Sequence, residues 1–123
     1  MEDYSLKNIS TQLIGTYGDS GGGSAPGIFR NPAAFITDTK RNLIVCDTGN
    51  HRIQKLDQNG NVLWIVGGIT SDGKPKIGTA PSEFYNPRAI CTDADDYIYV
   101  CDSFNCRVKK YDPMGNLIMM FGA

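Results

Sequence analysis

The sequence predicts an all-β fold built from repeated four-stranded units. Residues 29–67 align without a gap onto residues 84–122 at a constant offset of 55. A repeat of this length is typical of units that bury their apolar surface against one another. Within each copy, short apolar runs alternate with polar turn residues, which is the pattern of β-strands joined by tight turns.

The first copy contains four predicted strands, at residues 34–37, 43–46, 52–56 and 62–66. Polar turns separate them. The turn before the last strand, Asp57-Gln58-Asn59-Gly60, has the composition of a hairpin turn. The pair Gly67-Gly68 follows the fourth strand, and we expect the strand to end there.

The second copy repeats this order, with strands predicted at residues 89–92, 97–101, 107–111 and 117–121. Pro113 stands where a type I turn favours proline. Most of the strands are continuous apolar runs, which indicates burial on both faces. A four-stranded sheet covered by a similar sheet on each side is a blade of a β-propeller.

The repeat also divides the chain. Residues 1–10 are predicted to be an N-terminal extension, and residues 11–18 to be the last strand of a preceding blade, with Gly18 in the place of Gly67. Residues 19–67 then form the first blade with its leading loop, and residues 68–123 the second blade with its leading loop.

The run Asp47-Thr48-Gly49-Asn50-His51-Arg52-Ile53, with Pro32 before it, resembles the NHL repeat. The second copy departs from that pattern at residues 103–108, which lack the His and the Gly. The resemblance covers residues 13–122 and implies an NHL-type propeller of antiparallel four-stranded blades, incomplete in this chain. NHL propellers usually close with about six blades.

Closure needs more sheets than this chain carries, because two blades leave two apolar faces exposed. Three copies of the chain could supply a ring of about six blades as a homo-trimer. However, the strand predicted at residues 11–18 would compete with the neighbouring copy for one position. We therefore expect a fragment of a longer propeller more than a trimer.

Composition limits the possible partners. The formal net charge of -1 gives the chain no overall attraction to nucleic acid or to an anionic membrane. The N-terminus is acidic where a signal peptide is basic, and no apolar run approaches the length of about 18 residues that spans a bilayer. We expect a cytoplasmic protein without a membrane partner.

The cysteines, Cys46, Cys91, Cys101 and Cys106, form no C-x-x-C pair. This spacing disfavours a zinc site. Cysteines within apolar strands behave as small hydrophobic residues, so we expect buried, reduced thiols. No metal or other cofactor is predicted.

Three further features imitate functional sites. Gly18-Asp19-Ser20-Gly21-Gly22 resembles a protease nucleophile motif, but the single histidine, His51, falls in a blade turn, and a flexible connection is the better interpretation. The carboxylates at 93, 95 and 96 lack the glycine and distal glutamate of a calcium loop, which favours a solvated turn. His51 itself is expected to be a partly exposed turn residue rather than a metal ligand.

An Asp–Arg pair recurs between the second and third strands of both copies, as Asp47 with Arg52 and Asp102 with Arg107. A short loop would bring each pair together, so we expect a structural, charge-assisted hydrogen bond. The alternative is that these arginines point outward and take part in binding.

Two sets of loops lie on one face of a propeller: the d–a loops, which join the fourth strand of one blade to the first of the next, and the b–c loops, which join the second strand to the third. We call this the loop face. It combines basic and aromatic residues, including Lys74 and Lys76, with few acids, whereas the opposite turns are rich in aspartate. The predicted binding residues are Arg30, Asn31, His51, Arg52, Tyr85, Asn86, Arg88, Phe104, Asn105 and Arg107.

This mixture predicts a non-catalytic binding module, a scaffold that docks a protein partner on the loop face, because tyrosine and arginine are enriched at protein interfaces. Single-stranded RNA, as in NHL proteins of the tripartite-motif type, is the alternative, since arginine can bind phosphate and aromatic rings can stack on bases. A second alternative is a fragment of a propeller lyase or hydrolase.

Overall fold

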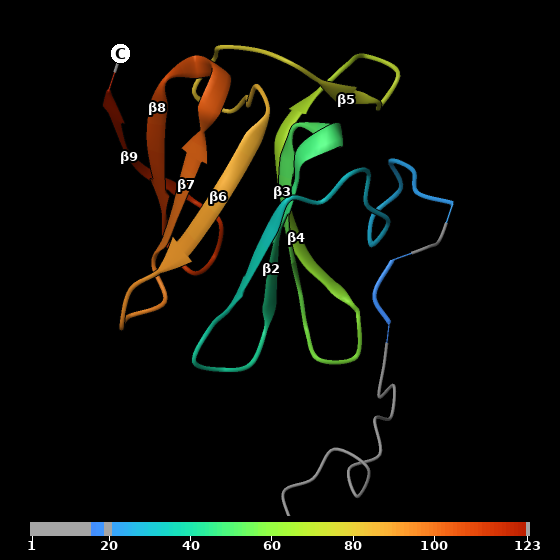
Figure 1. Ribbon diagram of the computed structural model, residues 1–123, viewed down its shortest axis with the longest axis vertical. Helices are drawn as coiled ribbons and strands as arrows, with labels where there is room; N and C mark the ends of the chain where they lie inside the picture. Colours follow the sequence, from blue (N-terminus) through green and yellow to red (C-terminus); the bar gives the residue numbers. More distant parts are fainter. Residues whose placement is uncertain (1–15, 19–20, 123) are drawn as a thin grey trace, which may run out of the picture.

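The computed structural model describes residues 16–18 and 21–122, which form two antiparallel sheets side by side (Figure 1). The first sheet contains β1 (Ala34–Thr37), β2 (Leu43–Asp47), β3 (Arg52–Leu56), β4 (Val62–Ile69) and β5 (Pro75–Lys76), in that order. The second contains β6 (Pro87–Thr92), β7 (Ile98–Asp102), β8 (Arg107–Tyr111) and β9 (Leu117–Gly122). The described residues also contain the 3-10 turns η2 (Thr48–Asn50) and η3 (Ser103–Asn105). The described residues are all-β, as predicted, and the sheets are two neighbouring four-stranded blades of an incomplete propeller, the first extended by β5.

The two sequence repeats also have the same register of strand pairing. Asp47 pairs with Arg52 between β2 and β3, and Asp102 pairs with Arg107 between β7 and β8. The irregularity at the end of β3 also recurs at the end of β8. The offset of 55 between residues 47 and 102 therefore relates backbone pairing as well as residue identity.

Strand β4 extends beyond the predicted end. It continues through Gly67 and Gly68 to Ile69 and pairs there with the short strand β5, which the sequence did not predict. Gly67 permits a close approach instead of ending the strand, since a Cβ at this position would lie 2.6 Å from the Cβ of Arg52. The prediction that the two glycines stop the strand was wrong.

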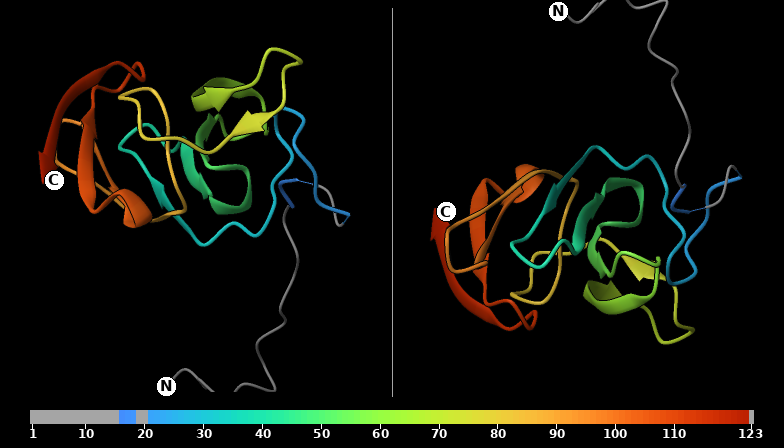
Figure 2. Two further views of the ribbon diagram at one scale, coloured as in Figure 1. Left: turned by 90° about the horizontal axis from the view of Figure 1, so that it is seen from above. Right: turned by 90° about the horizontal axis from the view of Figure 1, so that it is seen from below.

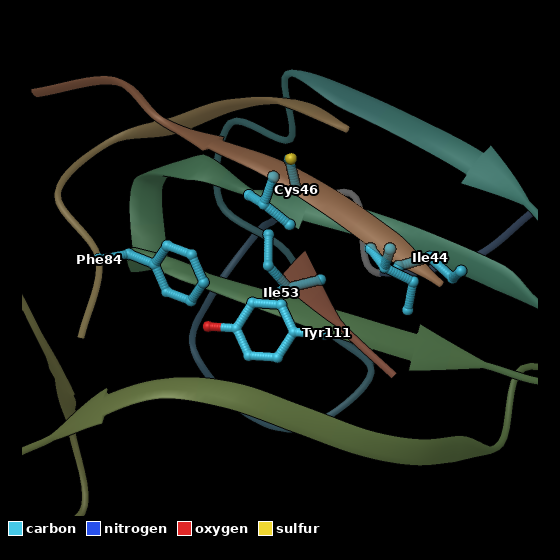
Figure 3. Close-up of a cluster of buried hydrophobic side chains, with 7 residues drawn as sticks. Ile44, Cys46, Ile53, Phe84 and Tyr111 are labelled. Atoms are coloured by element: carbon cyan, nitrogen blue, oxygen red, sulfur yellow. The ribbon is translucent and has the colours of Figure 1, made fainter. Parts of the chain in front are cut away.

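The apolar core lies between the two blades. Ile44, Cys46 and Ile53 of the first blade pack with Phe84 and Tyr111, and this core also includes Ile98 and Val100 (Figure 3). The innermost strands, β1 and β6, lie against one another. Seen along the sheets in Figure 2, the blades stand face to face, as neighbouring blades of a propeller do.

Polar contacts also join the blades. Thr39 donates from its backbone N to Asp96 Oδ1 at 2.9 Å and from its hydroxyl to Oδ2 at 2.5 Å. Asp96 is only 8% exposed. The prediction of a solvated carboxylate cluster was therefore wrong for Asp96, because its turn lies against the neighbouring blade. Trp64 Nε1 similarly donates to the Pro113 carbonyl at 3.1 Å.

The outer faces of the pair are exposed. Phe35 on β1 is 67% exposed and Phe121 on β9 is 46% exposed. All six residues of β9 are exposed, so burial on both faces was wrongly predicted for this strand. The reason is that each blade has one neighbour among the described residues. Closure by further blades or by three copies stays a prediction.

Tyr17 occupies on the first blade the position that Trp64 occupies on the second. The Tyr17 hydroxyl donates to the Gln58 carbonyl at 2.9 Å and its ring lies beside Gly60, while the Trp64 indole donates to the carbonyl of residue 113 and lies beside Gly115. The two acceptors and the two glycines are each 55 residues apart. Most of the strand predicted at residues 11–18 lies outside the described residues.

The cysteines differ in exposure. Cys46 is completely buried, but Cys91, Cys101 and Cys106 are exposed, and all four are free. The prediction of buried thiols holds for Cys46 and was wrong for the other three. Cys46 faces the second blade, whereas Cys101, at the same repeat position, lines a hollow on the outer face of that blade.

No helix in the described part of the chain combines the length and the apolar character needed to cross a membrane.

Candidate binding surface

The b–c loops have the same backbone path in both blades. After β2 the chain makes the turn η2 and reverses at His51, which adopts a left-handed conformation with φ 51°. After β7 it makes η3 and reverses at Cys106 with φ 54°. Both reversals lie on the loop face, which is at the top of Figure 1.

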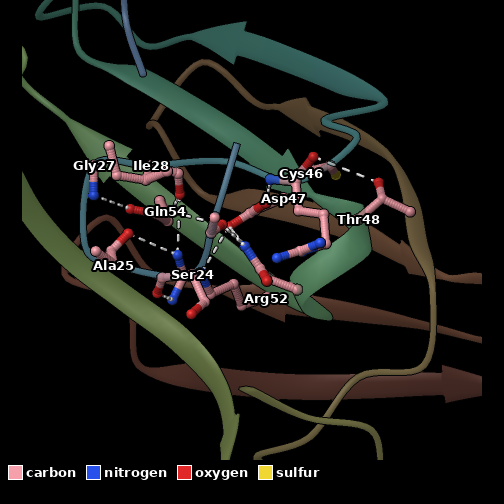
Figure 4. Close-up of polar contacts among 12 residues, drawn as sticks. Ser24, Ala25, Gly27, Ile28, Cys46, Asp47, Thr48, Arg52 and Gln54 are labelled. Atoms are coloured by element: carbon pink, nitrogen blue, oxygen red, sulfur yellow. Dashed lines mark hydrogen bonds and ion pairs between the residues drawn. The ribbon is translucent and has the colours of Figure 1, made fainter. Parts of the chain in front are cut away.

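Asp47 is the centre of the first loop system. Its side chain is fully buried, and its Oδ1 accepts a hydrogen bond from the backbone N of Arg30 at 2.7 Å. Its Oδ2 accepts from Arg52 Nε at 2.7 Å, and from the side-chain amides of Asn50 and Gln54 at 3.0 Å each (Figure 4). The carboxylate thus joins the b–c loop to the d–a loop.

Arg52 fixes the d–a loop from the other side. Its Nη1 donates to the carbonyl of Ser24 at 2.7 Å, and its Nη2 donates to those of Ala25 and Ile28 at 3.0 and 3.1 Å (Figure 4). All three guanidinium nitrogens are therefore engaged within the chain. The predicted structural bond between Asp47 and Arg52 is confirmed.

The second blade repeats this network at the same offset. Arg107 Nε donates to Asp102 at 2.8 Å, and its Nη atoms donate to the carbonyls of residues 79, 80 and 83. Asn105 Nδ2 donates to Gly78 O at 2.8 Å and to Asp102 at 2.9 Å. Of the predicted binding residues, Arg52, Asn105 and Arg107 therefore use their polar groups to hold the loops.

Four other predicted residues meet between the two loop systems. The rings of His51 and Tyr85 lie 5.9 Å apart at 75°, and those of Tyr85 and Phe104 lie 5.0 Å apart at 68°. The Arg88 guanidinium lies 6.0 Å from the Phe104 ring centre. Tyr85 is 38% exposed and Phe104 is 57% exposed. We call these four residues the aromatic cluster.

Asn86 links the cluster to the backbone. It adopts φ 58°, a left-handed conformation that asparagine tolerates well, and its backbone N donates to His51 Nδ1 at 2.9 Å. The Asn86 side-chain amide faces Arg88. With its oxygen turned toward Arg88, it accepts a hydrogen bond from Arg88 Nε at 2.7 Å.

Burial lowers the pKa of His51. His51 is half-buried in its turn, as predicted.

Arg30 and Asn31 occupy the equivalent places on the first d–a loop and are exposed. Position 49 of the b–c loop supplies no ring beside them, because it is a glycine, and a Cβ there would lie 2.6 Å from the Arg30 carbonyl oxygen. Phe104 replaces this glycine in the second blade. The divergence between the copies therefore creates an aromatic cluster at one loop system and an open, basic surface at the other.

The acids of the opposite face have structural roles. Asp57 Oδ1 accepts from the backbone N of Asn59 and of Asn61, at 2.9 Å each, and the bonds from Asn61 lower the pKa of this carboxyl. Asp112 makes the same turn in the second blade, and Asp38 and Asp93 make similar turns. Because these carboxylates hold turns together, the contrast in charge between the two faces is weaker evidence that the loop face binds a partner.

One exposed apolar residue of the loop face was not predicted. Ile77 is 48% exposed and follows β5. An isoleucine between Lys76 and Gly78 in the predicted d–a loop was the available signal. Within residues 16–18 and 21–122, no group of three or more His, Cys, Asp or Glu side chains could hold a metal ion.

Comparison with known proteins identifies the repeat. A family model of the NHL repeat matches residues 29–56. The chain is 35% identical over 115 residues to NHL repeat-containing protein 3 of Mus musculus and 31% identical over 115 residues to that of Homo sapiens, in both cases covering 91% of this chain and 31% of the relative. It is 26% identical over 99 residues to "Probable peptidyl-alpha-hydroxyglycine alpha-amidating lyase pgal-1" of Caenorhabditis elegans, covering 79% of this chain and 27% of that protein.

The chain thus spans between 27% and 31% of the length of these relatives. The residues matched by the family model include β1, β2, η2 and β3 of the first blade, together with the Asp47 network. The second blade reproduces the strand pairing and the hydrogen bonds of the first. The chain belongs to the NHL-repeat family.

Proposed function

We propose that this chain is a non-catalytic binding module whose loop face docks a protein partner through the aromatic cluster. The observation that carries the proposal is the exposure of Tyr85 and Phe104 beside Arg88 on loops that are joined by hydrogen bonds. Tyrosine and arginine are enriched among the residues that dominate interface energies. The hydrogen bonds around Asp102 hold these loops before any partner binds, which lowers the entropy cost of association.

Single-stranded RNA is the alternative ligand for the same face. The arrangement of the rings favours protein, because the Tyr85 ring already forms T-shaped contacts with two neighbouring rings and the Arg88 guanidinium lies 6.0 Å from the Phe104 ring centre. A base needs a free ring face on which to stack. The formal net charge of -1 also gives RNA no general attraction.

An enzymatic role, as a fragment of a propeller lyase or hydrolase, is the second alternative. Its support is the lyase name of one relative, whereas the two NHL repeat-containing relatives have no enzyme name. Neither name assigns an activity to this chain.

The proposal is tested by affinity capture with the full chain from cells that contain it, followed by mass spectrometry. The wild type is compared with the double variant Tyr85→Ser/Phe104→Ser. Truncating residues at the centre of an interface costs about 2 kcal/mol or more each, or about thirtyfold in affinity. We therefore expect the double variant to lose the proteins that the wild type retains, with or without ribonuclease treatment.

Met114→Ser is the matched control, because Met114 is 75% exposed in a turn on the opposite face. It should retain the partner proteins. Equal capture by the wild type and the folded double variant would contradict docking on the aromatic cluster. Loss of all captured protein on ribonuclease treatment would favour the RNA alternative.

A further inference from the structure

A second feature of the loop face lies next to the aromatic cluster. It is a hollow of about 510 Å³ between the turn η2 and the hairpin that joins β4 to β5. Arg30 and His51 line one side, and Lys74, Lys76 and Ile77 line the other. His51 thus belongs to both the hollow and the cluster, so one ligand could contact the two features together.

The lining is positively charged. Among the described residues it contains three cationic side chains and no carboxylate. Lys76 Nζ lies 2.9 Å from Glu83, outside the lining, and Lys74 Nζ lies 4.0 Å from Asp72, where both groups are well exposed and interact weakly. The Arg30 side chain makes no hydrogen bond or ion pair with any other described residue; its backbone alone is bonded, to Asp47 and Gly49.

His51 adds a neutral donor to this lining. Its Nδ1 accepts the backbone N–H of Asn86, so the ring carries its proton on Nε2. Burial lowers the pKa of this ring, which keeps it uncharged near neutral pH. The hollow therefore offers a guanidinium, two ammonium groups and one imidazole N–H, which are groups that donate to an anion.

Apolar side chains border the hollow. Ile77 is 48% exposed and lines it directly, and the exposed rings of Tyr85 and Phe104 lie beyond His51. An anion alone would leave this apolar surface in water. A peptide that carries a carboxylate next to apolar side chains would use both parts, and its charge is complementary to that of the lining.

We propose that this hollow binds a carboxylate side chain of an acidic peptide segment whose neighbouring apolar residues pack on Ile77 and the aromatic cluster. The inference rests on the proposed function, since it names the chemistry of the protein partner. It assigns to Arg30 and Lys74 the main contacts with the carboxylate, because neither forms a short ion pair with another described residue.

The test is fluorescence anisotropy with the full chain and a fluorescein-labelled peptide of alternating glutamate and leucine. The same peptide with glutamine in place of glutamate is the matched probe, and a labelled oligouridine is the RNA probe. We expect the glutamate peptide to bind at least about tenfold more tightly than the glutamine peptide, because a charge-assisted hydrogen bond contributes about 1.5 kcal/mol or more. Arg30→Gln and Lys74→Gln should each weaken this binding by about tenfold. Lys40→Gln, an exposed change on the opposite face, should leave it unchanged.

Equal affinity for the two peptides, or an unchanged affinity in the folded Arg30→Gln variant, would overturn the carboxylate site. The site would also be overturned if the chain bound oligouridine but not the glutamate peptide, and if both variants abolished the oligouridine binding. That result would assign the hollow to phosphate. The proposed function fails separately: if Tyr85→Ser/Phe104→Ser retains its captured proteins while the peptide still depends on Arg30, the carboxylate site stands and the docking surface does not.

Discussion

The Asp47 carboxylate accepts a hydrogen bond from Arg52 Nε at 2.7 Å, and both side chains are at least nine-tenths buried. The same bond joins Asp102 to Arg107 at 2.8 Å. In each blade the pair ties a b–c loop to the d–a loop beside it. Buried ion pairs therefore hold the loops of the loop face in place. They also fix the positions of the exposed residues that could contact a partner.

Removing one member of the buried pair should lower the free energy of unfolding. Asp47→Ala leaves the buried Arg52 guanidinium without its counter-charge, and breaking such a pair costs about 3–5 kcal/mol. Urea denaturation followed by circular dichroism measures the loss. Asp57→Ala, which removes a turn carboxylate on the opposite face, should cost less. Equal losses in the two variants would mean that the buried network does not stabilise the blade.

The interface between the blades should dominate stability. Ile53 is 1% exposed and packs against the second blade, so Ile53→Ala should lower the free energy of unfolding by about 2–5 kcal/mol through the lost contacts and the resulting cavity. Phe35→Ala, at a side chain that is 67% exposed on the outer face, is the control. A larger effect at Phe35 would show that the outer face is covered in solution.

The thiols should react in two classes. Cys91, Cys101 and Cys106 are exposed and should be modified quickly by a disulfide reagent under native conditions. Cys46 is fully buried, and burial raises its pKa to about 12, so it should react only after unfolding. Counting the modified thiols with time by mass spectrometry checks this. Protection of Cys101 in the native chain would instead indicate a neighbour on the outer face of the second blade.

Lys109 should make stability depend on pH. It is fully buried over the Phe84 ring, and burial lowers its pKa to about 8. Because this value lies below the unfolded value of 10.5, the unfolded chain binds more protons between these values, and stability should rise with pH from about 8 to 10.5. Lys109→Gln copies Gln54, which occupies the same place in the first blade, and should remove this contribution.

Urea denaturation at pH 8, 9 and 10 measures the difference between the wild type and Lys109→Gln. The comparison cancels the titration of other groups, such as Cys46, whose raised pKa acts in the opposite direction above pH 9. The stability of Lys40→Gln, a change at an exposed site, should depend on pH in the same way as that of the wild type. Parallel curves for Lys109→Gln and the wild type would mean that Lys109 titrates as a solvated lysine.

The blades could be predicted from the sequence because their strands, turns and loop bonds depend on residues close in the chain or repeated at a fixed spacing. The bond between Asp47 and Arg52 was predicted for that reason. Strand β5 was missed, since Pro75 is a poor strand residue and the glycines at 67 and 68 indicated a stop. Asp96 was misjudged because its partner, Thr39, lies in the other blade.

The aromatic cluster shows the same limit from the functional side. All four of its residues were among those predicted for the loop face, but their mutual contacts depend on how two loop systems of different blades are placed. No local pattern specifies that Tyr85 lies between His51 and Phe104. The hollow beside Arg30 depends on the position of β5 as well, so the sequence predicted its cations and not its shape.

Site-specific photo-crosslinking tests the central claim, that the loop face is the docking face, most directly. A photoreactive phenylalanine is placed at position 104 on the loop face or at position 114 in the opposite turn of the full chain, in cells that contain it. The account predicts protein adducts from position 104 that survive ribonuclease, with none from position 114. Adducts from position 114 alone, or only RNA adducts from position 104, would contradict it.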